Sequence, residues 1–279
     1  MIRSHFGTRR NPFETDLDTK LLDHQAKHIS YIETHSQQQG LTVLFGEPGT
    51  GKTILKHHLM KYNPDTWLTL VINRAMHTWQ NILRLLCQTL DLESCGRDNT
   101  CEARILDEVR KLNHKGKTLI LIIDDAHLIP IDALRKLRLL MEDFPKNHNL
   151  VLLGQAELMT RFQLRPNADF LSRITYTSEM TLLSPAGIED FILGQLDLAE
   201  LPHNTFSEAA INLINKSNGG NLRATKNLCV GGMIEAVRNQ TRTVDIQQIN
   251  SVLNQPHWRH NNQLEGIEPL VFTNQRPEF

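Results

Sequence analysis

The segment GEPGTGKT at residues 46–53 constrains this chain more than any other feature. An apolar run at 41–45 leads into it and a helix-like run at 54–61 leads out of it. The segment fits the pattern G-x-x-x-x-G-K-[ST], which marks a phosphate-binding loop when it joins a strand to a helix. The fixed positions of that pattern are Gly46, Gly51, Lys52 and Thr53. A glycine turn with an incidental lysine is the alternative, and the flanking segments argue against it.

The chemistry of such a loop follows from its residue types. Glycines let the backbone curl so that N–H groups face phosphate oxygens, and the following helix N-terminus favours negative charge. Lys52 is suited to neutralise β- and γ-phosphate charge, and Thr53 to ligate Mg²⁺. We therefore predict a nucleotide site formed by Gly46, Glu47, Pro48, Gly49, Thr50, Gly51, Lys52 and Thr53.

Composition excludes several classes of protein. The chain has 279 residues, 40% of them hydrophobic and 22% charged, which is ordinary for a soluble globular protein. The net charge of -1 excludes a globally basic nucleic-acid binder, so any such surface must be a local patch. No apolar run is long enough to cross a bilayer, and the basic N-terminus lacks the apolar stretch of a signal peptide. We expect a cytoplasmic protein with no membrane partner.

Extended apolar runs alternate with helical periodicity over the first two thirds of the chain, which predicts an α/β fold with a central parallel sheet. After the loop strand come runs at 67–72, 118–123, 149–153 and 174–183. From Pro185 to about 253 only helix signals occur, and from Pro256 the chain is polar and proline-punctuated. The expected domains are 1–183, α/β with an irregular lead-in over 1–20, then a small helical domain at 184–254 and a flexible tail at 255–279.

Two acidic residues stand where a ligand site is expected. The run 118–123 is apolar without alternation, which is typical of a strand buried on both faces, and it ends in Asp124-Asp125. Ligands of open α/β sheets bind at the carboxyl ends of the strands. Asp124 is therefore the predicted Mg²⁺ partner, through water, and Asp125 the predicted base that polarises the attacking water. The alternative is that the pair caps the following helix.

Three further polar residues fit the same site. Gln155 follows the run at 149–153, where its side chain can position water or sense the γ-phosphate. Arg173 precedes the last extended segment and is a candidate arginine finger, although Arg161 and Arg165 are rivals nearby. Arg223, after Gly219-Gly220-Asn221-Leu222, begins a helix of the small domain and is predicted to fold back onto the nucleotide.

Taken together, these features resemble the AAA+ ATPases, and among them the ExeA/GspA-like branch, which shares its fold with the TniB/TnsC/MuB transposition ATPases. The resemblance covers roughly residues 5–250 and is carried by positions 6–7, 11–13, 152–158, 172–174 and 219–224. It implies a P-loop AAA+ module with a central parallel sheet flanked by helices, followed by a small all-helical lid. It further implies ATP with Mg²⁺, a homo-oligomer in ring or filament form, and an arginine finger that acts in trans.

One departure from the family pattern concerns Asp125. Many relatives carry Asp-Glu where this chain has Asp124-Asp125, and aspartate is one methylene shorter. The base is then placed differently, so we expect slow, partner-stimulated hydrolysis.

Two functional readings compete for this ATPase. The first is a transposition helper that assembles on double-stranded DNA and recruits a transposase, with the tail that carries Trp258 and Phe272 as the contact. The second is a secretion-associated ATPase, whose relatives usually add a membrane segment and a cell-wall-binding domain that we do not find in this sequence. A nucleotide switch that binds only proteins is a third. Arg74, Arg135 and Arg138 are the predicted DNA contacts.

Overall fold

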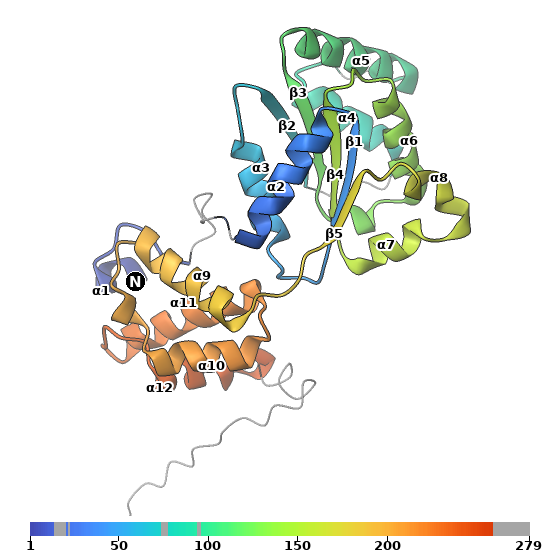
Figure 1. The fold of residues 1–279 in the computed structure, drawn as a ribbon. Helices are drawn as coiled ribbons and strands as arrows, with labels where there is room; N and C mark the ends of the chain where they lie inside the picture. Colours follow the sequence, from blue (N-terminus) through green and yellow to red (C-terminus); the bar gives the residue numbers. More distant parts are fainter. Residues whose placement is uncertain (14–20, 22, 74–77, 94–95, 259–279) are drawn as a thin grey trace, which may run out of the picture. The chain divides into compact units, whose positions relative to one another are not determined.

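The computed structural model describes residues 1–13, 21, 23–73, 78–93 and 96–258 (Figure 1). By its internal contacts the chain divides into two compact units. One is Leu21–Thr181, and the other combines Met1–Lys20 with Leu182–Phe279. We call them the α/β unit and the helical unit, and we describe each by itself.

The α/β unit is built on a five-stranded sheet in the order β2-β3-β4-β1-β5, with every neighbouring pair parallel. The strands are β1 (Gly40–Phe45), β2 (Trp67–Ile72), β3 (Thr118–Ile123), β4 (His148–Gly154) and β5 (Tyr176–Glu179). The predicted parallel sheet is confirmed. The last strand is shorter than the expected segment at 174–183, because its pairing with β1 begins only at Thr42↔Tyr176 and ends at Phe45↔Glu179.

Helices cover both faces of this sheet, as Figure 1 shows. On one face the core joins the sheet to α2 (Asp23–Ser36) and α3 (Lys52–Lys61). On the other face the core takes in α4 (Trp79–Thr89), α5 (Asp98–His114), α6 (Ile131–Glu142), α7 (Ala156–Phe162) and α8 (Ala168–Leu171). Two short 3₁₀ turns, η1 (Ala126–Leu128) and η2 (Arg165–Asn167), connect these elements.

Strand β3 shows why its sequence lacks alternation. Leu119, Leu121 and Ile123 belong to the core on the α4–α8 face, whereas Ile120 and Ile122 belong to the core on the α2–α3 face. All five side chains are at most 4% exposed, which is the burial expected of a central parallel strand. The strand therefore ends at a fixed place in the sheet and carries Asp124 with it.

The helical unit contains the four helices expected after Pro185, namely α9 (Pro185–Leu198), α10 (Glu208–Asn218), α11 (Leu222–Arg238) and α12 (Ile246–Leu253), together with the 3₁₀ turn η3 (His203–Thr205). Ser207 caps α10 by accepting a hydrogen bond from the Ala210 amide. Asp245 and Gln248 form a capping box at the start of α12. Serine and aspartate are among the residues that most favour this position at a helix N-terminus.

The first residues of the chain correct the expected domain boundary. Residues 1–20 were expected to lead into the α/β domain, but the described part of this segment, residues 1–13, belongs with the helical unit. The segment forms α1 (Ile2–Phe6), and the His5 Nε2 atom lies 2.7 Å from the Thr241 carbonyl oxygen. Phe13 is 1% exposed, with its ring 5.8 Å from that of Phe206. Burial of these aromatic rings stabilises the packing of the segment on the helical unit, although the segment precedes the α/β unit in the sequence.

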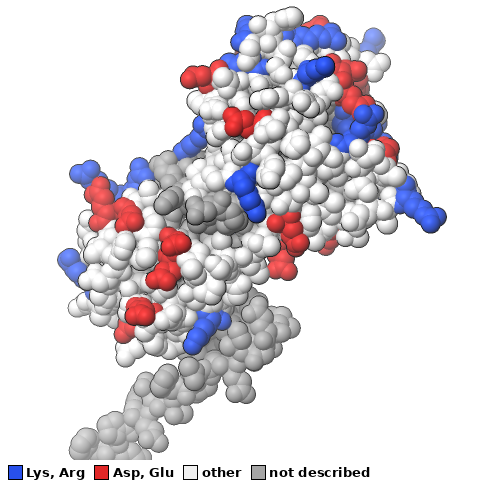
Figure 2. All heavy atoms as spheres, viewed as in Figure 1, with Lys and Arg blue, Asp and Glu red and all other residues white. Residues whose placement is uncertain are grey.

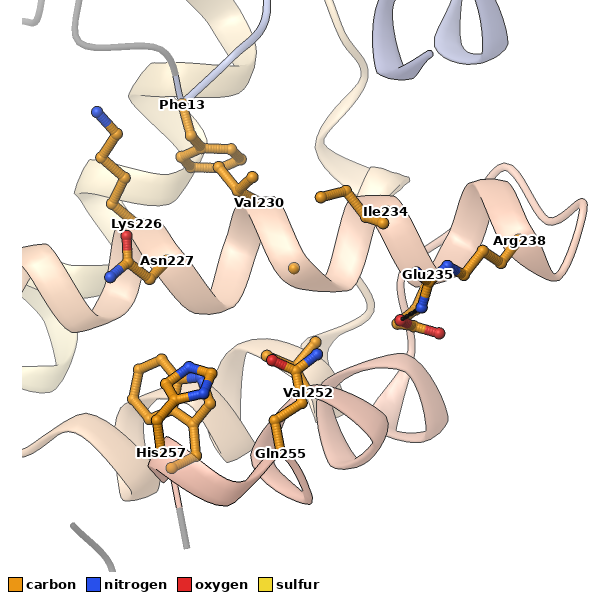
Figure 3. Close-up of a pocket in the computed structure, with 12 residues that line it drawn as sticks. Phe13, Lys226, Asn227, Val230, Ile234, Glu235, Arg238, Val252, Gln255 and His257 are labelled. Atoms are coloured by element: carbon orange, nitrogen blue, oxygen red, sulfur yellow. Dashed lines mark hydrogen bonds and ion pairs between the residues drawn. The ribbon is translucent and has the colours of Figure 1, made fainter. Parts of the chain in front are cut away.

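The start of the expected tail also packs on the helical unit. Residues 256–258 form a helical turn, and Trp258 is 7% exposed rather than free. Trp258 and Phe13 line a groove of about 580 Å³ that runs along α11 (Figure 3). Phe272, the second tail residue predicted to contact a partner, lies outside the described residues. In the part of the chain that the structure describes, no helix is long and apolar enough to cross a membrane.

Candidate nucleotide site

The loop between β1 and α3 has the backbone that a phosphate cradle needs. Gly51 has φ 92°, a left-handed conformation that glycine adopts without steric cost. Gly46 needs glycine for a different reason, because a Cβ there would lie 2.3 Å from the Met180 carbonyl oxygen. The Gly46 amide donates to the Gly154 carbonyl at 3.1 Å, which fixes the loop to the end of β4.

The Lys52 ammonium group folds back on its own loop. It donates to the Gly46 and Glu47 carbonyl oxygens, both at 2.7 Å, and to the Thr50 hydroxyl at 3.3 Å. The residue is 9% exposed, so its charge is held inside the loop rather than in solvent. These contacts place the ammonium where it can exchange backbone carbonyl partners for phosphate oxygens.

Helix α3 begins at the loop and presents its N-terminus there. Gly51 is the N-cap residue and, having no side chain, cannot satisfy the first-turn N–H groups. The helix dipole adds to the attraction for an anion. Thr53 lies exposed in this first turn, so its hydroxyl is open to a metal-bound nucleotide.

Asp124 follows β3 and is held by two contacts. Its Oδ1 atom accepts from the Asp125 amide at 3.0 Å, and its Oδ2 atom accepts from the Lys56 ammonium at 2.7 Å. Lys56 also donates to the Asn73 side-chain oxygen at 2.8 Å. The Lys56 and Asp124 side chains are 9% and 14% exposed, so this ion pair is largely withdrawn from water. Burial and the charge of Lys56 lower the pKa of the adjacent His57.

Asp125 combines a left-handed backbone conformation with an exposed side chain. Its φ of 52° lies in the left-handed region, which costs energy for residues other than glycine and is best tolerated by asparagine and aspartate. The side chain is exposed beside η1. The capping alternative is not seen, because Asp125 makes no side-chain cap to η1 and the next helix, α6, has Pro130 as its N-cap residue.

Strand order brings Gln155 between the loop and the acidic pair. β4 lies between β1 and β3, and Gln155 follows β4 directly as the N-cap residue of α7. Neighbouring strands are about 5 Å apart, so the phosphate loop and Asp124 stand about 10 Å apart with Gln155 between them. The structure therefore brings the loop, Asp124, Asp125 and Gln155 to one edge of the sheet.

These residues fit ATP with Mg²⁺. The donor set combines an ammonium, a helix N-terminus and a hydroxyl with a carboxylate, which are the groups that phosphate and Mg²⁺ prefer. The loop residues, with Lys52, would hold the phosphates, and Thr53 and Asp124 would hold Mg²⁺. Bound Mg²⁺ supplies charge neutralisation for phosphate oxygens.

Arg173 lies at the end of the sheet where the strands begin, opposite the end that carries the phosphate loop. It precedes β5 by three residues, whereas the β5 residue paired with the end of β1 is Glu179. The Thr175 amide donates to the Leu41 carbonyl oxygen at 2.9 Å, and Arg173 lines a pocket with Gly40, so Arg173 lies where β1 begins. The phosphate loop follows the other end of β1, so Arg173 is distant from the loop of its own subunit. Its side chain is 64% exposed, with Nε 3.5 Å from a Glu142 carboxylate oxygen. Of the rivals, Arg161 is engaged, donating to the His127 and Ile129 carbonyls at 2.6 and 2.8 Å.

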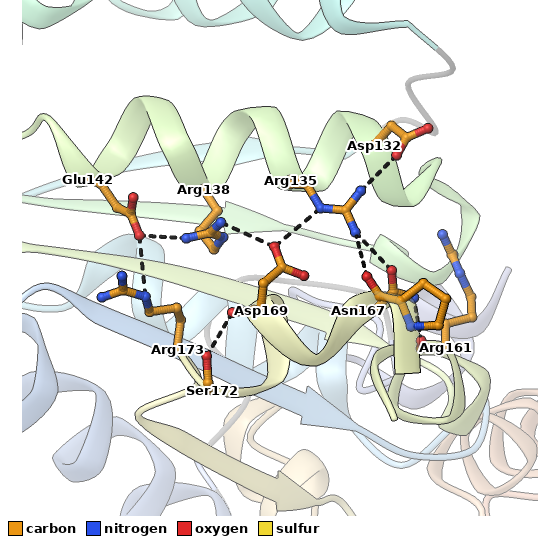
Figure 4. Close-up of polar contacts among 10 residues, drawn as sticks. Asp132, Arg135, Arg138, Glu142, Arg161, Asn167, Asp169, Ser172 and Arg173 are labelled. Atoms are coloured by element: carbon orange, nitrogen blue, oxygen red, sulfur yellow. Dashed lines mark hydrogen bonds and ion pairs between the residues drawn. The ribbon is translucent and has the colours of Figure 1, made fainter. Parts of the chain in front are cut away.

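Two predicted DNA contacts, Arg135 and Arg138, form hydrogen bonds and ion pairs within the α/β unit (Figure 4). Arg135 donates to Asp132 at 2.9 Å, to Asp169 at 3.3 Å and to the Asn167 side chain at 3.0 Å. Arg138 donates to Asp169 at 3.4 Å and also pairs with Glu142, and its side chain is only 11% exposed.

These contacts shift the pKa of the Asp169 carboxylate, which both arginines contact. Partial desolvation raises the pKa of Asp169, but the hydrogen bond and charge of Arg135 and the charge of Arg138 outweigh it, so the pKa is lowered. Both guanidinium groups join α6 to the α8 region. Arg135 and Arg138 stay predicted DNA contacts, with guanidinium groups that already have partners within the α/β unit.

The remaining predicted residues stay predictions. Arg74 lies outside the described residues. Arg223 is exposed in the first turn of α11, after Asn221 caps that helix by accepting from the Ala224 amide at 3.1 Å. On the face drawn in Figure 2, lysine and arginine side chains are interspersed with aspartate and glutamate, so that face presents mixed charge.

Sequence reasoning missed Lys56 and Asn73. Lys56 lies four residues after Lys52, which places both on one face of α3, and Asn73 directly follows β2. The spacing was visible in the sequence, but only the packing of α3 on the sheet shows that Lys56 reaches the end of β3.

Residues 34–162 match the AAA domain family, and this segment contains the loop, the acidic pair and Gln155. The α/β unit is therefore similar to the nucleotide-binding part of AAA+ P-loop ATPases, and its site residues fit ATP with Mg²⁺.

Two curated relatives narrow this class. General secretion pathway protein A of Aeromonas hydrophila is 25% identical over 249 residues, which is 85% of this chain and 45% of that protein. The Mu-like prophage FluMu DNA transposition protein B of Haemophilus influenzae is 28% identical over 123 residues, covering 44% of this chain and 40% of that protein. Each match covers less than half the length of that protein. The resemblance to the ExeA/GspA-like and MuB-related ATPases is thereby confirmed.

A solved structure of similar fold is the Aeropyrum pernix ORC1 protein in complex with DNA. It matches with a TM-score of 0.70 and 13% identity, and the match covers 93% of this chain and 72% of that one. At this identity the likeness supports the AAA+ fold alone.

Proposed function

We propose that this protein uses ATP to assemble on double-stranded DNA and serves as a helper in DNA transposition, where it would select target DNA and recruit a transposase. The observation that carries the proposal is a phosphate loop and acidic pair of AAA+ type in a chain related to a Mu-like transposition protein. A fold neighbour solved in complex with DNA is consistent with it.

Each site residue has a proposed role. Lys52 and the loop bind the phosphates, Thr53 and Asp124 hold Mg²⁺, and Asp125 accepts a proton from the attacking water. Gln155 orients that water, because it lies at the same sheet edge. Arg223 contacts the nucleotide from the helical unit.

We propose that the protein works as a homo-oligomer. Arg173 is exposed at the sheet edge away from the phosphate loop, so its guanidinium can serve only the nucleotide of a neighbouring subunit. An arginine finger supplied in trans requires assembly for fast hydrolysis. Slow hydrolysis by the isolated chain would follow.

Assembly would also create the DNA surface. A chain of net charge -1 binds DNA weakly as a monomer, but a small basic patch repeated along an oligomer multiplies phosphate contacts. Arg74, Arg135 and Arg138 remain our predicted contacts. The test below uses Arg74, because Arg135 and Arg138 also join α6 to the α8 region.

A secretion-associated ATPase is the second candidate. The match to General secretion pathway protein A extends over 85% of this chain, which is more than the transposition protein covers. That candidate predicts nucleotide binding without DNA binding. So does the third, a protein-binding nucleotide switch.

Fluorescence anisotropy with a labelled random duplex separates these proposals. We expect binding that requires a non-hydrolysable ATP analogue, tolerates any sequence and falls steeply with salt, because each phosphate contact releases a counterion. Reversing the charge at Arg74 should weaken binding to all sequences alike, whereas reversal at Lys111, an exposed lysine paired with Glu108, should not. Oligomers that form with the analogue but bind no duplex at low salt would favour the second or third candidate.

A further inference from the structure

The Lys56 ammonium pairs directly with Asp124, at 2.7 Å from Oδ2. Its ammonium joins three elements, since Lys56 comes from α3, Asp124 from the end of β3 and Asn73 from the end of β2. The Asp124 amide in turn donates to the Ile72 carbonyl at 3.0 Å, so the two strand ends are held together beneath this lysine.

We propose that Lys56 is a positioning residue that holds the Asp124 carboxylate and sets the Mg²⁺ concentration at which the site takes up metal-bound nucleotide. This inference rests on the proposed role of Asp124 in holding Mg²⁺.

The contacts of Asp124 give the physical reason. Each oxygen of the Asp124 carboxylate has one donor, the Asp125 amide on Oδ1 and the Lys56 ammonium on Oδ2, and each can still accept a further contact. A divalent cation held by this carboxylate, directly or through water, therefore lies close to a fixed positive charge. Like charges at such range repel strongly where water is largely excluded, and both side chains are mostly buried.

Two effects of removing Lys56 oppose one another. Loss of its hydrogen bond leaves Asp124 less well oriented, which weakens metal binding. Loss of the Lys56 charge removes the repulsion of the cation, which strengthens metal binding. The charge effect is the larger, because the Asp125 amide still fixes Oδ1 and the repelled cation carries two charges.

The test is an Mg²⁺ titration of nucleotide binding, monitored with a fluorescent ATP analogue. Lys56→Met should lower the Mg²⁺ midpoint about tenfold relative to wild type, by loss of one close charge. Lys56→Gln keeps a hydrogen-bond donor without the charge and should lower the midpoint in the same direction. Lys111→Met removes a lysine from an exposed carboxylate pair on α5 and should leave the midpoint unchanged. Far-UV circular dichroism verifies that each variant is folded.

The outcomes separate this inference from the site assignment. If Asp124→Asn leaves the Mg²⁺ midpoint unchanged, Asp124 does not hold the metal and the assignment itself fails. If Asp124→Asn shifts the midpoint while Lys56→Met and Lys56→Gln do not lower it, the role of Lys56 alone is refuted. Should Lys56→Met fail to fold, Lys56→Gln decides, and an unchanged Mg²⁺ midpoint in Lys56→Gln refutes the inference.

Discussion

Replacing Phe13 with alanine tests the least expected feature of the fold, which is that the start of the chain belongs to the helical unit. Phe13 is 1% exposed, and its ring centroid lies 5.8 Å from that of Phe206 and 6.5 Å from that of Phe191. Truncating a buried phenylalanine costs about 3–5 kcal/mol. The groove beside Phe13 lets water enter the space left behind, so we expect the lower end, about 3 kcal/mol.

The assay is urea denaturation followed by the fluorescence of Trp258, which lines the same groove, in a Trp67→Phe/Trp79→Phe background. With a slope of about 1–3 kcal/mol per molar urea, a loss of about 3 kcal/mol lowers the midpoint by about 1–3 M. Phe170→Ala is the matched control, because Phe170 is equally buried but stacks on Phe162 in the α/β unit.

We expect Phe13→Ala to lower the Trp258 midpoint and Phe170→Ala to leave it nearly unchanged. A shift below about 0.5 M in Phe13→Ala would mean that residue 13 contributes little to the helical core. An equal shift of the midpoint in both variants would refute the assignment of Phe13 to the helical unit.

Three further predictions concern the site and one helix cap. Asp125→Asn should bind ATP and Mg²⁺ as wild type does but release phosphate far more slowly; an unaltered rate of phosphate release argues against a base at this position. Arg173→Ala should bind ATP and hydrolyse it poorly, and mixing it with Lys52→Ala should restore part of the activity, because each supplies what the other lacks at one interface. Intact mixed oligomers without recovery would contradict a trans finger. Asp245→Ala should cost about 1 kcal/mol by loss of the α12 cap. Hydrogen bonds from the Ser207 hydroxyl and the Ile246 amide lower the pKa of Asp245, so this stabilisation is complete above its ordinary value of 3.8 and is lost as the pH falls through the folded pKa. Asp245→Asn, which caps without titrating, should keep most of the stability and lose that acid dependence, and an acid dependence equal to that of wild type would show that Asp245 is not its source.

Local pattern determined much of the α/β unit. Strands β2 and β3 have the bounds that their runs predict. For β3 the reason is that a parallel strand buried on both faces needs an unbroken apolar segment. The phosphate loop is fixed by its glycines, and Asp124 is placed by the end of β3. Helix ends were also readable where a cap marks them, as Ser207 and Asp245 show.

The sequence did not reveal that α1 and Phe13 pack on the helical unit. Their partners are about 180 to 240 residues away along the chain, as the contacts of Phe13 with Phe191 and of His5 with Thr241 illustrate. Periodicity reports which face of an element is apolar but not which distant surface covers it. The isolated Trp258 was misread as part of a free tail for the same reason.

Sequence by itself thus determined the class of fold, the phosphate loop and the acidic pair, since each depends on residues that are neighbours along the chain. Tertiary structure decided the strand order that sets Gln155 between loop and acid, and the pairing of Lys56 with Asp124 across 68 positions. It also decided that Arg138 holds α6 to the α8 region instead of facing solvent. A charged side chain looks the same in sequence whether it is solvated or paired, and only the packing of its surroundings distinguishes the two.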